Sequence, residues 1–170
     1  MIRSCVSGIA LFATSLSLLG CATDVVEDAD ENLGVSQQRL FTTIIVASGY
    51  GLCVGADGNY NGAPVRLMPC NGSAGQQWTL DPSNFSVRVF GNKCLDIRAN
   101  GPEGSPLQAW DCNGWPNQKW NLVSNPNGTS SLMNIGTEWR MTAGQFPTQG
   151  SVLRVYSPGY GLWQYFDIYI

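Results

Sequence analysis

The sequence predicts an all-β protein built from three copies of one unit of ~40 residues, with pseudo-threefold symmetry. A motif of Gln, any residue and an aromatic residue begins at Gln76, Gln118 and Gln164. Short apolar runs alternate with clusters of Gly, Asn, Pro and Ser, which is typical of strands joined by turns. No stretch carries a sustained helical period. Because one such unit cannot bury a face alone, we expect the three copies to close around a shared axis.

Matched segments locate the strands inside each unit. The expected strands include the apolar runs at 43–47, 64–68, 85–90 and 152–156. A glycine followed by a largely apolar stretch occurs once per unit, at 62–67, 104–109 and 150–155. A second matched stretch precedes it, at 51–54, 92–95 and 138–141. The aromatic residues that close the motif are expected to form the core, one from each unit: Trp78, Trp120 and Phe166.

Four cysteines occupy equivalent positions in the first two units, and the third unit has none there. Because matched units should close matched loops, we predict the disulfides Cys53–Cys70 and Cys94–Cys112. The alternative is a zinc site made of all four thiolates. The absence of any CxxC pair favours the disulfides, and so does the export that the N-terminal residues predict, as described next.

The N-terminal residues predict export. One positive charge, Arg3, precedes an apolar run over 5–19 that is short for a transmembrane helix and typical of a signal peptide at 1–20. The run ends at 18–21 in Leu-Leu-Gly-Cys, which resembles the bacterial lipobox. That resemblance implies cleavage before Cys21 and lipidation of its thiol. Ordinary secretion with cleavage nearby is the alternative.

Residues 21–40 are expected to form an acidic, disordered tether ahead of a folded domain at 41–170. The tether has five acids and one base, Arg39, whereas residues 41–170 have seven of each. The net charge of the mature protein therefore lies in the tether. Ala22 directly after Cys21 favours the outer membrane or cell surface over the inner membrane. The expected localisation is the bacterial cell envelope, through a lipid anchor.

Composition argues against several classes of function. The chain has no histidine, which removes the commonest general base and metal ligand, so we expect no metal site and no cofactor. Basic clusters are absent, so nucleic acid is not an expected partner. No Gly-x-Ser-x-Gly motif occurs. Asp96 and Asp111 could be imagined as a glycosidase pair, but Asp111 should point to the opposite face of its strand from Trp110. We therefore expect the protein not to be an enzyme.

The motifs together resemble the ricin-type β-trefoil lectin family. The resemblance rests on Cys-Leu-Asp at 94–96, a Gly-x-Pro-apolar-Gln strand at 104–108, Cys-Asn-Gly at 112–114 and the Gln-x-Trp endings. It covers 41–170, all of the expected folded part. It implies a β-trefoil of twelve strands with one potential sugar pocket per repeat.

The second repeat has every residue that the resemblance implies for a sugar pocket. Asp96 would accept hydrogen bonds from sugar hydroxyls, and Trp110 would cover the apolar face of the ring. Gln108 lies two residues before Trp110, so both side chains should point to the same side of the strand. Asn117 and Gln118 match the family's amides. Gln118, like Gln76 and Gln164, is also expected to bond the backbone.

The other two repeats depart from the pattern. In repeat one Gly55 replaces the Asp and Met68 the aromatic plate, so we expect no pocket there. Repeat three has Thr142 and Tyr156 at these positions, which leaves a weak or altered site open.

The sequence thus predicts a lipid-anchored module that binds a glycan of galactose or xylose type. The alternative is a protein-interaction or envelope-scaffold trefoil with vestigial pockets, because a fold alone does not decide function. A buried Trp110 would favour that alternative.

Overall fold

The computed structural model describes residues 40–159 and 161–169. The predicted signal peptide, the lipidation site at Cys21 and the tether apart from Leu40 lie outside these residues. The described part contains twelve strands and four short 3-10 helices, which confirms the all-β prediction. No helix within it is long and apolar enough to cross a membrane.

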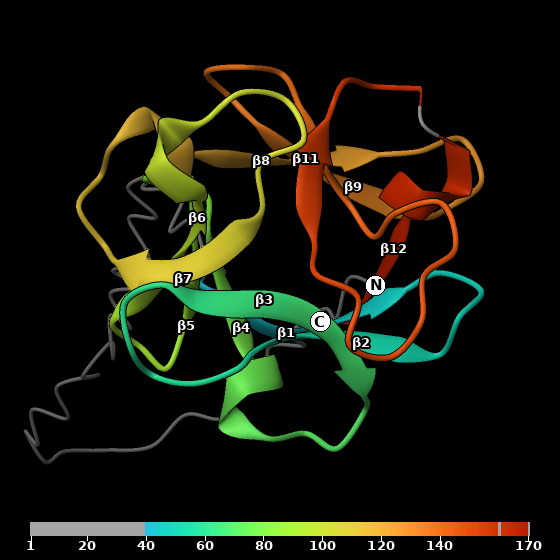
Figure 1. The fold of residues 1–170 in the computed structure, drawn as a ribbon, viewed down its shortest axis with the longest axis horizontal. Coiled ribbons are helices and arrows are strands. Elements are labelled where there is room, and N and C mark those ends of the chain that lie inside the picture. The colour runs from blue at the N-terminus through green and yellow to red at the C-terminus, as the bar shows by residue number, and fades with distance from the viewer. Residues whose placement is uncertain (1–39, 160, 170) are drawn as a thin grey trace, which may run out of the picture. The chain divides into compact units, whose positions relative to one another are not determined.

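Each repeat supplies four strands, and Figure 1 shows the repeats as three sectors of the domain. Repeat one contains β1 (Phe41–Ala47), β2 (Leu52–Ala56), β3 (Ala63–Pro69), η1 (Ala74–Gln76) and β4 (Trp78–Asp81). Repeat two contains β5 (Ser86–Val89), β6 (Lys93–Ile97), η2 (Arg98–Asn100), β7 (Leu107–Asp111), η3 (Pro116–Gln118) and β8 (Trp120–Ser124). Repeat three contains β9 (Ser130–Asn134), β10 (Arg140–Thr142), β11 (Arg154–Tyr156), η4 (Gly161–Gln164) and β12 (Phe166–Tyr169).

The first and last strands of the repeats form a barrel. The antiparallel pairs are β12–β1, β1–β4, β4–β5, β8–β9 and β9–β12. Between β5 and β8 the Trp120 amide donates to the Phe85 carbonyl at 2.7 Å. The middle strands pair as the hairpins β2–β3, β6–β7 and β10–β11, which form a cap. This arrangement is the β-trefoil that the resemblance implied.

The cap repeats its hydrogen bonds around the pseudo-threefold axis. Gly62, Gly104 and Gly150 open the matched segments, with φ of 88°, 87° and 87°, a region that favours glycine. Their amides donate, respectively, to the carbonyls of Ala109, Val155 and Leu67, each in a neighbouring repeat. The recurring glycine of the sequence therefore marks the place where one hairpin turns to meet the next.

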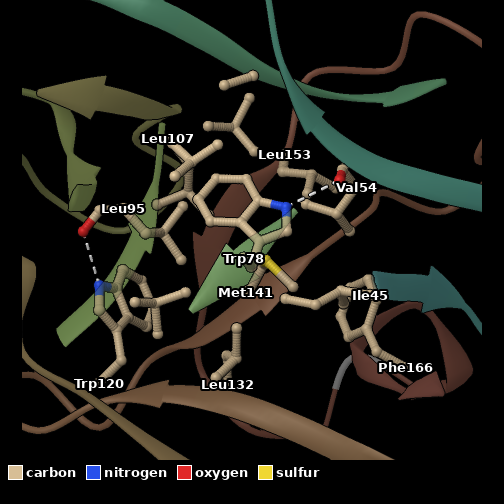
Figure 2. Packing of buried hydrophobic residues seen from close by; sticks show 14 of the residues in the cluster. Ile45, Val54, Trp78, Leu95, Leu107, Trp120, Leu132, Met141, Leu153 and Phe166 are labelled. Carbon is tan, nitrogen blue, oxygen red and sulfur yellow. Dashed lines mark hydrogen bonds between the residues drawn. The ribbon is translucent and has the colours of Figure 1, made fainter. Parts of the chain in front are cut away.

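The core lies on the same axis. Trp78, Trp120 and Phe166 are almost fully buried, as the sequence predicted (Figure 2). The indole nitrogens of Trp78 and Trp120 donate to the carbonyls of Val54 and Leu95, at 2.9 and 2.8 Å. Each tryptophan thereby ties the end of its repeat to that repeat's own hairpin.

Two expected strands are shorter than their apolar runs. Phe85 and Phe90, at the ends of the run 85–90, have φ of 59° and 55°, which leaves only β5 between them in the extended form. The run 152–156 begins with an isolated bridge between Val152 and Arg66, and β11 starts two residues later. Turns flank β5 and override strand propensity at Phe85 and Phe90, and Val152 pairs with repeat one instead of extending β11.

The predicted disulfides Cys53–Cys70 and Cys94–Cys112 are both present. They leave none of these four cysteines as a thiolate for zinc.

The motif glutamines hydrogen-bond the backbone of the turn that follows the third strand of each repeat. The Gln76 side-chain nitrogen donates to the Pro69 carbonyl at 2.8 Å, and that of Gln164 donates to the Ser157 carbonyl at 2.9 Å. In repeat three, the Gln164 hydrogen bond therefore holds this turn without a disulfide.

Candidate functional site

The β6–β7 hairpin brings Asp96 and Gln108 together. They are direct cross-strand partners, so their side chains lie on the same face of the hairpin. The Gln108 side-chain nitrogen donates to Asp96 Oδ1 at 2.8 Å. Asp96 is only 2% exposed, yet it lines a cavity of about 570 Å³. A buried carboxylate therefore faces a cavity of ligand size.

Helix η3 supplies two further amides to the same carboxylate. Asn117 Nδ2 donates to Asp96 Oδ2 at 2.7 Å, and Gln118 Nε2 donates to it at 3.0 Å. Gln118 also donates to the Asp111 carbonyl and accepts from the Asn113 amide, and it lies outside the cavity lining. We therefore expect Gln118 to position Asp96 rather than to touch a ligand. The other four predicted residues line the cavity.

Trp110 forms an aromatic wall of the cavity. It is 39% exposed, while its strand neighbours Leu107 and Ala109 are buried. The structure thus places Trp110 on the solvent side of β7, as the alternation of the strand predicted. A buried Trp110 would have favoured the alternative of a trefoil with vestigial pockets, and the exposed indole does not.

Sequence reasoning missed several lining residues, of which Trp115 is the largest. Trp115 is 64% exposed, and its amide donates to Asn113 Oδ1 at 2.9 Å. The Gln118 amide donates to its carbonyl at 2.9 Å, so the backbone that carries this indole is held at both ends. A tryptophan directly after the polar Cys-Asn-Gly turn was the available indication of a binding role. Arg98 and Asn100 of η2 also line the cavity.

Asn61 enters the cavity from repeat one, and its polar contacts fix one wall. Its Nδ2 donates to Asp111 Oδ2 at 2.7 Å, and its Oδ1 accepts from Lys93 Nζ and from the Asp111 amide, both at 2.9 Å. Hydrogen bonds from Lys93 and then Asn61 lower the pKa of Asp111. Asp111 is committed to this network and is not among the cavity residues. The structure therefore does not bring Asp96 and Asp111 together as a catalytic pair.

Burial raises the pKa of Asp96 above its ordinary value of 3.8, although hydrogen bonds from Gln108, Gln118 and Asn117 oppose the shift. The folded state therefore binds this proton more tightly than the unfolded state. Ionisation of Asp96 opposes folding, so its contribution to stability is most favourable below pH 3.8 and falls as the pH rises through the raised value.

Ligand binding should show the reverse dependence on pH. A protonated Asp96 loses acceptor capacity, so we expect the affinity for a neutral sugar to fall on acidification. The midpoint should lie above that of an ordinary aspartate, because the pKa of Asp96 is raised. Calorimetric titrations between neutral pH and pH 4 measure this, and an affinity that stays constant over the range would contradict it.

The other two repeats show what becomes of an incomplete pocket. In repeat one, a Cβ added at Gly55 would lie 2.6 Å from Met68 Sδ, so Met68 fills the place where a carboxylate would project. In repeat three a cavity of about 360 Å³ remains beside Tyr156 and Trp163. There Thr142 Oγ1 donates to the Arg140 carbonyl and accepts from Gln164, so the polar centre carries no charge.

Comparisons with known proteins agree with this geometry. A family model described as ricin-type beta-trefoil lectin domain matches residues 41–155. A search of curated proteins found no match. Among solved structures, the designed threefold-symmetric protein ThreeFoil is similar at 20% identity and a TM-score of 0.70, over 76% of this chain and 98% of its own.

Two plant proteins are more similar in sequence. The agglutinin from Abrus precatorius has 26% identity and a TM-score of 0.65, over 78% of this chain and 49% of its own. A non-toxic type II RIP homologue from Momordica charantia (bitter gourd), solved with α-methyl-D-galactoside, has 27% identity and a TM-score of 0.63, over 76% and 48%. This chain thus spans about half the length of either plant chain. Since the family model covers more than half of this chain, the chain belongs to the ricin-type β-trefoil lectin domain family, whose members are carbohydrate-binding modules.

Proposed function

We propose that the protein binds a glycan through the cavity of its second repeat. The observation that carries this proposal is a buried carboxylate, Asp96, that three side-chain amides hold in one orientation beside an exposed indole. A carboxylate orients sugar hydroxyls, and an indole face packs against the apolar side of a sugar ring. The galactoside bound to the bitter gourd protein supports a galactose-type ligand.

The hydrogen bonds around Asp96 leave room for a ligand. A carboxylate has about four acceptor positions, and the three amides use three of them. Oδ1 accepts one of these bonds and Oδ2 two, so the remaining position lies on Oδ1. Asn117 Oδ1 is buried without a hydrogen-bond partner among the described residues. A sugar with neighbouring hydroxyls would satisfy both acceptors, whereas an apolar ligand would leave them unpaired.

Trp115 extends the proposed site beyond one sugar ring. Its indole lines the same cavity as Trp110 and is more exposed. Two aromatic walls in a cavity of about 570 Å³ suit a disaccharide or a longer chain better than a single ring. Trp110 would cover the ring that Asp96 holds, and Trp115 would contact the ring next to it.

Lipidation of Cys21 and export to the cell envelope belong to the same proposal. Their support is the apolar run and the Leu-Leu-Gly-Cys sequence that ends it. A single open pocket of this kind should bind with a dissociation constant of about 1 mM. Many copies anchored on one surface would raise the effective affinity for a repeating polysaccharide, because the second contact becomes intramolecular.

Replacement of the tryptophans by alanine tests the pocket. We expect Trp110→Ala to weaken lactose or methyl galactoside binding about tenfold, through loss of ring stacking. Trp115→Ala should weaken lactose and leave methyl galactoside nearly unchanged, because the latter has one ring. Trp163→Ala, in the repeat-three cavity, is the matched control and should leave both unchanged. Because dissociation constants of about 1–10 mM are expected, NMR titration with these sugars and with xylobiose measures the effects. Loss of binding in Trp163→Ala with retention in Trp110→Ala would overturn the assignment.

A further inference from the structure

A second cavity, of about 190 Å³, lies on the cap where the three hairpins meet. Three antiparallel β-bridges recur around the axis, and each joins one repeat to the next: Pro64 with Gln108, Pro106 with Arg154, and Val152 with Arg66. The second residue of each bridge therefore occupies the same position in its own repeat. This position is an arginine in repeats one and three, Arg66 and Arg154, and Gln108 in repeat two.

Arg98 supplies the guanidinium that repeat two lacks at this position. It follows β6 directly, and its Nε donates to Gln108 Oε1 at 3.2 Å. Arg66, Arg98 and Arg154 all line the axial cavity, so each repeat contributes one arginine. Arg66 and Arg154 are held in matching ways, because each donates from Nη1 to a carbonyl, of Gly150 and Gly104 respectively.

The positive charge of this cavity is only partly neutralised. Asp57 pairs with Arg66 Nε at 2.7 Å, and no ion pair to Arg98 or Arg154 occurs among the described residues. The remaining walls are glycine, proline, leucine, valine and Gln108, which carry no charge. Residues 41–170 are neutral as a whole, so this local excess of positive charge is a feature of the axis and not of the entire domain. Guanidinium groups suit carboxylate and sulfate oxygens geometrically.

The axial cavity adjoins the proposed sugar site. Gly62, Arg98 and Gln108 line both cavities. Gln108 connects them chemically, since its nitrogen donates to Asp96 and its oxygen accepts from Arg98. A group attached to a sugar on Asp96 would therefore meet arginine on the far side of Gln108.

We propose that the axial cavity binds an anionic group, a carboxylate or a sulfate ester, carried by the glycan whose sugar occupies the Asp96 site. The preferred ligand is accordingly an acidic glycan. This inference rests on the proposed function, because the sugar site brings the anion to the arginines.

Matched neutral and acidic sugars test the proposal on the full chain. Digalacturonate is compared with its methyl ester, and lactose 3′-sulfate with lactose, so that the two pairs separate carboxylate from sulfate. At low salt we expect at least one acidic sugar to bind about fivefold more tightly than its neutral partner. The difference should shrink at high salt, because exposed charges are screened.

Arg154→Gln is the decisive variant, because Arg154 lines the axial cavity and not the sugar cavity. It should abolish the preference for the acidic sugar and leave lactose binding unchanged. Arg88→Gln, which makes the same charge change on β5, should retain the preference. The inference is wrong if neither acidic sugar binds better than its partner, or if Arg154→Gln keeps the preference.

Failure of the proposed function would look different. In that case Asp96→Asn would leave the binding of lactose and of both acidic sugars unaltered. A third outcome is that Asp96→Asn still binds the acidic sugars while Arg154→Gln does not. That result would overturn the inference that the sugar site brings the anion to the arginines, because the axial cavity would then bind anions without the sugar site.

Discussion

Asp96→Asn should abolish detectable sugar binding while the domain stays folded. The substitution keeps the shape of the side chain but replaces one acceptor oxygen by a donor NH₂ group. That NH₂ group would face an amide donor from Gln108 or from η3, so the hydrogen bonds that orient the side chain at position 96 would be lost. Loss of a charged hydrogen bond costs about 1.5–3 kcal/mol, which is roughly a tenfold to hundredfold loss of affinity. From about 1 mM, such a loss puts the dissociation constant beyond ordinary titration.

The matched control for this variant is Asp111→Asn. Asp111 is on the neighbouring strand and pairs with Lys93 outside the cavity. Its replacement removes the same charge, but an asparagine there keeps one side-chain oxygen for Asn61 and the backbone amide that donates to Asn61 Oδ1. Sugar affinity should therefore stay within about twofold. Circular dichroism before titration checks that both variants are folded. Equal sugar affinity of Asp96→Asn and the wild type would remove Asp96 from the binding site.

Trp78→Ala should produce the largest loss of stability. The side chain is fully buried in the core of the trefoil, among side chains of the barrel and the cap (Figure 2). Truncating a buried aromatic side chain costs about 3–5 kcal/mol, because it removes apolar burial and leaves a cavity. This is a large part of the 5–15 kcal/mol that typically stabilises a domain. Urea denaturation followed by fluorescence or circular dichroism measures the free energy of unfolding.

Trp78→Phe separates packing from hydrogen bonding. Repeat three carries Phe166 at the equivalent position, so a phenyl ring is compatible with this part of the core. The substitution removes the indole bond to the Val54 carbonyl and part of the ring. We expect it to lower the free energy of unfolding by about 1–2 kcal/mol, well below the effect of alanine. Equal losses for both variants would show that the core does not depend on the volume of this side chain.

The fold could be predicted because its information is local and repeated. The matched cysteines pair and the motif glutamines bond the backbone, as predicted, and the recurring glycines occupy equivalent turns. Strand ends were harder, since Phe85 and Phe90 take positive φ values that their side chains do not favour. Both residues lie in turns directly outside β5, which strand propensity does not indicate.

The site could be predicted in part. Asp96, Gln108, Trp110 and Asn117 lie on one hairpin and the helix packed against it, so the family resemblance of a single repeat was enough to identify them. Asn61 belongs to another repeat, and its approach to the cavity depends on how the hairpins meet at the cap. Arg98 reaches the cavity from a turn in which Ala99 and Asn100 have φ of 55° and 49°. No periodicity of the sequence indicates such a turn.

The six tryptophan indole N–H signals in an ¹H–¹⁵N NMR spectrum give the most direct test of a glycan site in repeat two. On titration with lactose, we predict that Trp110 and Trp115 shift. Trp78 and Trp120 should stay in place, because their indoles are bonded inside the core. Single tryptophan-to-phenylalanine variants assign the signals. A spectrum in which lactose shifts only Trp163, or no indole at all, would contradict the account.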